Sequence, residues 1–218
     1  MRKISRLASV AMALALSAGA ASAADLIPYP AAGAYNATTY AFTATTTGDL
    51  TAAIVGGFSA GYTNELGVLV NGVAQGGFGL NNHTSVLGDT YNFGPVTAGD
   101  SLIFVLHNLS RGLDAFSLAS MNLAYDSVGY AGGHNHVYST AYTATPALGG
   151  VAPGVYVGFE DLAFPGSDYN YTDESFVFRN ITRTPAGVPE PATWAMLVMG
   201  LGLVGAGLRA RRPATAAA

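Results

Sequence analysis

The densest group of metal-ligating side chains in the sequence lies between residues 160 and 174. It holds five carboxylates and one amide, those of Glu160, Asp161, Asp168, Asn170, Asp173 and Glu174. Ca²⁺ takes about six to eight oxygen ligands in a flexible geometry, which an acidic, turning segment can supply. The segment is not an EF-hand, because the glycine and the final glutamate of that loop are missing. We predict an irregular Ca²⁺ site. The alternative is a solvated loop whose Asp and Asn side chains bond the local backbone.

A second group of candidate ligands is the pair His134 and His136. On a strand, residues two apart share one face, and two imidazoles in this arrangement can chelate Zn²⁺ or Cu²⁺. A third ligand would have to come from His83, His107 or a distant carboxylate. Exposed histidines beside a turn are the alternative explanation.

The sequence carries few signs of catalysis. It has no G-x-S-x-G elbow and no H-E-x-x-H motif. Glu160 and Asp173 could act as a glycosidase acid and base only if they faced each other across a cleft. We therefore expect no enzyme. Tyr169 and Tyr171 could stack on sugar rings beside bound Ca²⁺, or be half-buried tyrosines of a sheet.

The elements that must position these residues are β-strands. Runs of β-forming residues recur every ten to fifteen residues, with turn signals between them and no convincing helix before the C-terminal segment. Asn71-Gly72 predicts a hairpin, residues 101–107 a central strand, and residues 137–142 a further strand. Residues 174–181 are expected to form the final strand, with Phe176 and Phe178 on one face and Val177 on the other. The pattern predicts an all-β domain of β-sandwich or jelly-roll type.

The remaining segments are expected to be irregular. Residues 76–89 are polar and rich in glycine, which predicts a loop. Residues 184–189 contain two prolines and are expected to form a short linker to the C-terminal segment.

The C-terminus combines three parts in a fixed order. A Pro-Glu-Pro sequence at 189–191 cannot continue a strand or a helix interior. Residues 192–208 form an apolar stretch that suits a weak membrane helix, and arginines at 209–212 would stay on the cytoplasmic side. The motif comprises Pro189, Glu190, Pro191, Trp194 and Ala195.

This segment resembles the PEP-CTERM sorting signal, in the variant with Trp-Ala after the motif. The resemblance implies cleavage by an exosortase-type membrane enzyme in a Gram-negative bacterium that makes exopolysaccharide. The chain would insert transiently into the inner membrane and then reach the outer surface or the medium. An ordinary C-terminal membrane anchor is the alternative.

The N-terminus agrees with export. Basic residues precede an apolar run at residues 10–16, which is too short to span a bilayer. Ala21-Ser22-Ala23 is a small-x-small cleavage site, so we expect signal peptidase to cut between Ala23 and Ala24 after Sec-dependent export.

Charge and cysteine content exclude several classes of function. Between residues 24 and 188 there are twelve acidic residues and three arginines, a formal charge of −9. Such a surface repels nucleic acid and favours divalent metals. The absence of cysteine excludes disulfides, thiolate zinc sites and a cysteine nucleophile.

The acidic segment carries a second resemblance. Its Phe-Glu-Asp-Leu and Gly-Ser-Asp sequences, ahead of an aromatic-rich strand, resemble a domain-of-unknown-function family of bacterial surface proteins with the approximate pattern FEDL…GSDxDxND. This chain departs from the pattern at Asn170, where Asp is usual, and at Thr172, where Asn is usual. The resemblance implies a β-rich extracellular module without establishing an activity.

Together these observations predict three parts: a signal peptide at residues 1–23, an exported β-sandwich at 24–184, and a sorting segment at 185–218. The predicted role is structural or adhesive, at the cell surface or in a biofilm matrix, with Ca²⁺ as the expected cofactor. A lectin-like module that binds exopolysaccharide is the alternative, and a secreted hydrolase is the third.

Overall fold

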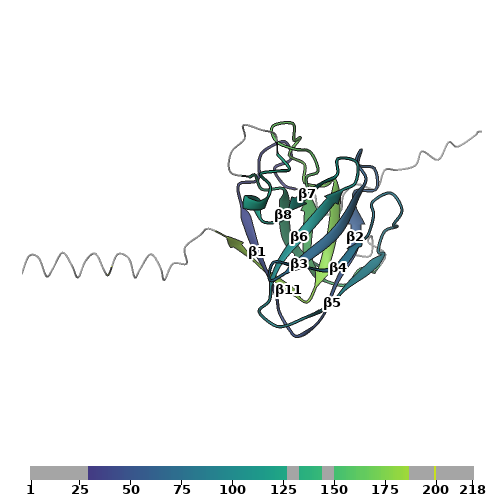
Figure 1. The fold of residues 1–218 in the computed structure, drawn as a ribbon, viewed down its shortest axis with the longest axis vertical. Helices are drawn as coiled ribbons and strands as arrows, with labels where there is room; N and C mark the ends of the chain where they lie inside the picture. The colour runs from purple at the N-terminus through teal and green to yellow at the C-terminus, as the bar shows by residue number, and fades with distance from the viewer. Residues whose placement is uncertain (1–28, 127–132, 144–149, 187–198, 200–218) are drawn as a thin grey trace, which may run out of the picture.

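The computed structural model describes residues 29–126, 133–143, 150–186 and 199 (Figure 1). Within these residues the chain forms eleven strands and one short 3₁₀ helix, η1, at Ala119–Met121. The strands are β1 (Thr39–Ala44), β2 (Gly48–Gly56), β3 (Asn64–Val70), β4 (Val73–Gly79), β5 (Thr90–Val96), β6 (Ser101–Asn108), β7 (Leu113–Phe116), β8 (Val137–Tyr142), β9 (Gly154–Phe159), β10 (Glu174–Arg179) and β11 (Ile181–Ala186).

The strands form two antiparallel sheets. Sheet A has the order β11-β1-β6-β3-β4, with β7 also paired to β6, and sheet B has the order β5-β2-β10-β9-β8. The first and last strands are neighbours, so β1 lies beside β11 in Figure 1. The predicted all-β sandwich is confirmed, and β6 is a central strand with partners β1, β3 and β7.

The core lies between the two sheets. Alternate residues of each strand face inward, as the period of two requires. Phe104 of sheet A stacks on Phe178 of sheet B with ring centroids 3.8 Å apart. Phe176 and Phe178 both belong to this core, as predicted, while Val177 packs in a smaller cluster on the other face of sheet B.

Two expectations about irregular segments were wrong. Residues 76–79 belong to β4, where Gly79 pairs with Leu66, because the exposed edge of β3 offers backbone partners that glycine can use without a side chain. Residues 184–186 are not linker but the end of β11, which pairs with β1 up to Ala186. Ala186 is two residues beyond the predicted domain boundary at 184.

Candidate metal centre

The acidic residues meet at one end of the sandwich, where β9 ends and β10 begins. These strands are antiparallel neighbours, and Phe159 pairs with Glu174. The chain leaves β9 through Glu160 and Asp161 and returns through Asp173. The backbone N–H of Asp173 donates to the carbonyl of Phe159 at 3.0 Å, which closes the loop of residues 160–173. Strand pairing therefore brings together acids that are separated by more than ten residues in sequence.

Three carboxylates converge in this loop. One oxygen from each of Glu160, Asp168 and Asp173 can be chosen so that all three lie within 4.8 Å of one another. Glu160 is fully buried, Asp173 is half-buried and Asp168 is exposed, so the group runs from the interior to the surface. This spacing suits carboxylates that share one cation. We call these three residues the acidic triad.

The loop backbone holds all three members of the triad in place. Asp168 accepts a hydrogen bond from the N–H of Asn170 at 3.1 Å. Glu160 accepts hydrogen bonds from the N–H groups of Leu162 and Asn170 at 3.1 and 3.3 Å. Asp173 accepts one from the N–H of Asp161 at 2.9 Å.

Asn170 serves mainly to shape the loop. Its side-chain carbonyl accepts from the N–H and hydroxyl of Thr172, and its amide donates to Asp168 at 2.9 Å. This is local backbone bonding of the kind that Asn favours in turns.

Burial and mutual repulsion perturb the titration of the acids. Burial, followed by the charges of Asp161 and Glu160, raises the pKa of Asp173 to about 8. Burial also raises the pKa of Glu160 and of Asp161. In the described residues the ion pairs involve only histidines with Asp114 or Asp126, so none neutralises the triad. A bound cation would provide that compensation.

Two more oxygen-bearing side chains, those of Asn64 and Glu174, lie near Asp161. Asn64, at the start of β3, donates to Asp161 at 2.8 Å. Its own side-chain carbonyl oxygen is buried without a hydrogen-bond partner within the described residues, as are both carboxylate oxygens of Glu174. Burial, followed by the charges of Asp161 and Glu65, raises the pKa of Glu174 well above its usual value.

The two histidines that were predicted as metal ligands both contact the same carboxylate. Both His134 and His136 contact the buried carboxylate of Asp126, at 3.1 and 2.9 Å. The second ring nitrogen of His136 lies 2.9 Å from the carbonyl oxygen of Glu160, so neither nitrogen of this ring is free for a metal. His83 contacts Thr63 and Ala60, and His107 pairs with Asp114. The four histidines therefore do not assemble a chelate.

Asp126 itself was not singled out by the sequence. Burial alone would raise its pKa, but hydrogen bonds from His136, from the N–H of Phe164 and from His134 hold the pKa well below its usual range. Both ring nitrogens of His136 lie 2.9 Å from an acceptor oxygen, one of Asp126 and one of the Glu160 backbone. The contact between Asp126 and His136 links the segment after η1 to Glu160 of the triad. Its only sequence signal is an acid eight and ten residues before two histidines.

The tyrosines proposed for sugar stacking are not available in this loop. Tyr171 is fully buried, and its hydroxyl accepts from the N–H of Asn36 at 2.9 Å. Tyr169 is half-buried and packs against Tyr35 and Phe164. This placement contradicts the prediction that these two rings stack on a sugar.

Several predicted features lie outside the described residues: the signal peptide at 1–23, its cleavage site at Ala23 and Ala24, the apolar stretch at 192–208 and the basic tail at 209–212. The sorting residues Pro189, Glu190, Pro191, Trp194 and Ala195 lie outside them too. Among the residues that the structure describes, no helix combines the length and the apolar character needed to cross a membrane.

Comparisons with known proteins identify the C-terminal segment. No curated protein and no solved structure matches the chain. Residues 187–212 match the family model of the PEP-CTERM protein-sorting motif, in agreement with the motif and spacing seen in the sequence. The chain therefore carries a PEP-CTERM protein-sorting motif, which supports its assignment as an exported protein processed by an exosortase.

Proposed function

We propose that the exported domain is a structural or adhesive module of the cell surface or the extracellular matrix of a Gram-negative bacterium, stabilised by Ca²⁺ at the acidic triad. The observation that carries the proposal is the convergence of Glu160, Asp168 and Asp173 within 4.8 Å without a basic partner. The sorting motif supports delivery to a compartment outside the cytoplasm.

The chemistry of the triad favours a hard divalent cation. Its ligands are carboxylate oxygens, and Ca²⁺ accepts both monodentate and bidentate carboxylates in irregular loops. The raised pKa of Asp173 means that the carboxylate is costly to ionise without a cation. A divalent ion would replace the proton and relieve the repulsion among the three acids.

The position of the triad explains how a cation would stabilise the module. Glu160 follows β9 directly, and Asp173 directly precedes β10. Asp168 lies in the middle of the loop that joins these strands. An ion held by all three would tie the loop to the ends of two central strands of sheet B. Such a module would stiffen outside the cell, where Ca²⁺ is abundant, without any catalytic step.

The proposal is tested by thermal unfolding of the full-length protein in non-ionic detergent, with EDTA or with millimolar Ca²⁺. A ligand at about 100 times its Kd adds about 2.7 kcal/mol to the free energy of unfolding. For a chain of this size, that corresponds to a rise of about 5–10 °C in Tm. We expect this rise in the natural protein and its loss in Asp168→Asn, whose exposed carboxylate can be removed without opening the core.

Asp114→Asn is the matched control, since it removes the same charge from β7, outside the triad. It should keep the full response to Ca²⁺. The proposal is wrong if the natural protein has the same Tm in EDTA and in Ca²⁺. It is also wrong if Asp168→Asn keeps the full rise of Tm with Ca²⁺. Mg²⁺ at the same concentration should have a smaller effect, because it demands a more regular, octahedral shell.

A further inference from the structure

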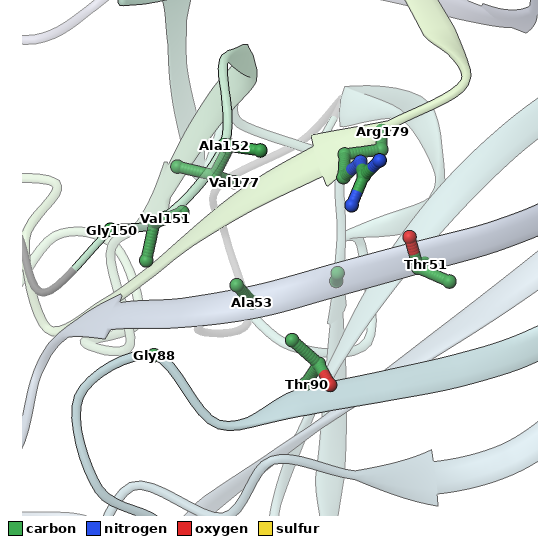
Figure 2. Close-up of a pocket in the computed structure, with 10 residues that line it drawn as sticks. Thr51, Ala53, Gly88, Thr90, Gly150, Val151, Ala152, Val177 and Arg179 are labelled. Carbon is green, nitrogen blue, oxygen red and sulfur yellow. The ribbon is translucent and has the colours of Figure 1, made fainter. Parts of the chain in front are cut away.

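The outer face of sheet B carries a groove that is unrelated to the acidic triad. Its floor comes from three neighbouring strands, β5, β2 and β10. Thr51 pairs with Arg179, while Ala53 is flanked by Thr90 on one side and Val177 on the other. Since side chains alternate along a strand, these residues point out of the same face of the sheet. Figure 2 shows Arg179 on β10, Thr51 and Ala53 on β2, and Thr90 on β5.

Small residues leave the groove open. A cavity of about 270 Å³ lies over Ala53 and is bounded on one side by Gly88 and on the other by the segment Gly150–Ala152 (Figure 2). Val151 from that segment is buried against Val177 and Ala53, so the wall is packed onto the sheet. A second cavity of about 490 Å³ adjoins it and also includes Thr51 and Arg179. These volumes are of the order of small-ligand sites.

Arg179 lies where the two cavities meet. Its side chain is exposed and, within the described residues, forms neither a hydrogen bond nor an ion pair. It is also one of only three arginines between positions 24 and 188, a range that contains no lysine. Of the other two, Arg111 covers the ring of Tyr125 and Arg183 lies over Tyr40. The planar guanidinium of Arg179, with five N–H donors, is thus available to a carboxylate from outside the chain.

The rest of the lining suits a saccharide. Thr51 and Thr90 offer hydroxyl groups, and Thr45 and Thr46 do so in the second cavity. The oxygens of these hydroxyls can accept hydrogen bonds from sugar hydroxyls. Val151 and Val177 provide an apolar wall for the C–H face of a sugar ring. A mostly neutral lining with a few placed polar groups is typical of small-molecule sites.

We propose that this groove, the Arg179 groove, binds an acidic saccharide, with the carboxylate of one sugar unit against Arg179 and neighbouring hydroxyls against the threonines. The formal charge of −9 in residues 24–188 and the presence of Asp49 in the second cavity oppose a densely charged polymer. A glycan with isolated carboxylates therefore fits better than a polyanion. The groove uses none of the triad residues, so it does not depend on the Ca²⁺ proposal.

The test measures binding of galacturonate oligosaccharides to the full-length protein in detergent, by calorimetry in low salt. EDTA is present throughout, so that Ca²⁺ cannot bridge the oligosaccharide to the triad. The same oligosaccharide with methyl-esterified carboxylates serves as the neutral probe, and acetate serves as the free anion. We expect saturable binding of the acidic oligosaccharide, at least about 10-fold tighter than that of either probe.

Three variants locate the site. Arg179→Gln should weaken binding about 10-fold or more by removing the charged donor. Ala53→Leu should weaken it without any change of charge, because the larger side chain fills the first cavity. Arg183→Gln removes the same charge from sheet A and should leave the Kd within about 2-fold.

Four outcomes would overturn the proposal: no saturable binding, equal binding of the neutral oligosaccharide, equal binding of acetate, or equal losses in Arg179→Gln and Arg183→Gln. The last two would indicate recognition of charge alone. A normal Ca²⁺ response in a protein that fails this test would leave the triad intact and reject only the groove.

Discussion

The carboxylate of Asp126 joins several segments at the acidic end of the sandwich. Its buried carboxylate accepts hydrogen bonds from the N–H of Phe164, from the backbone and ring of His134, and from the ring of His136. His136 in turn donates to the carbonyl oxygen of Glu160, the first residue of the triad. The buried pair of Asp126 and His136 thus connects the loop after η1 to the loop that carries the triad.

Asp126→Asn should be strongly destabilising. The amide would place a donor among groups that already donate and would remove the carboxylate that the buried His136 contacts. Losing one partner of a buried ion pair costs about 3–5 kcal/mol. Denaturant midpoints at pH 7 would measure this. Asp114→Asn, which breaks a partly exposed pair with His107, should cost less than about 1 kcal/mol.

The same pair should make the protein acid-sensitive. The pKa of Asp126 is lower in the folded state than the value of about 3.9 expected in the unfolded state. Its contribution to stability is therefore fully present above that value and is lost as the pH falls below about 4. If the denaturant midpoints of the natural protein and of Asp126→Asn fall equally between pH 5 and pH 3, this role for Asp126 is wrong.

At the level of the elements, the triad depends on how closely β2 approaches the start of β10. Gly57, just after β2, has a φ of +95°, and a Cβ built there would lie only 2.2 Å from the carbonyl oxygen of Asp173. Only glycine allows this approach, because backbone atoms cannot swing away as a flexible side chain can. The close contact holds Asp173 beside the end of β9.

Gly57→Ala should therefore displace Asp173 and weaken both the fold and the cation site. We expect a loss of about 1–3 kcal/mol in the free energy of unfolding and a smaller rise of Tm with Ca²⁺. Gly61→Ala is the control, since nothing lies within 4 Å of a Cβ at that position. A full Ca²⁺ response in Gly57→Ala would show that the triad does not need this contact.

At the scale of the whole molecule, the two sheets share one core and should unfold together. The contact of Phe104 with Phe178 lies at the centre of that core, and both side chains are completely buried. The residues that hold the triad come from sheet B and from the loops at its end. The Arg179 groove occupies the outer face of the same sheet. Both sites therefore depend on packing against sheet A.

Phe104→Ala should cost about 3–5 kcal/mol, since it opens a cavity between the sheets. Phe78→Ala, on the exposed side of β4, should cost much less. Urea unfolding followed by tyrosine fluorescence and by circular dichroism should give one coincident transition in both variants. Two separate transitions would mean that the sheets are independent units, contrary to the shared core.

The sequence alone determined the class of fold, several strands and the sorting motif that indicates export. Strand 137–142 was predicted with its observed bounds, as was the hairpin at Asn71-Gly72, because alternation and turn chemistry are local signals. The sorting motif was recognised from residue types and spacing within one segment. The acids of the candidate metal site were also named, since they are close together in sequence.

Only the tertiary structure decided which contacts these residues make. The predicted final strand at 174–181 was wrong at its end: β10 stops at Arg179, since Asn180 has a φ of +66°, and Ile181 begins β11. The strand β11 was missed because a Pro- and Ala-containing segment becomes a strand only when β1 offers it an edge. The role of Asp126 was not predicted, nor were its contact with His136 and the burial of Tyr171. These features depend on contacts between residues that are distant in sequence. The Arg179 groove depends on the register of three strands that are far apart in sequence. Local patterns specify elements, but the pairing of strands decides which side chains meet.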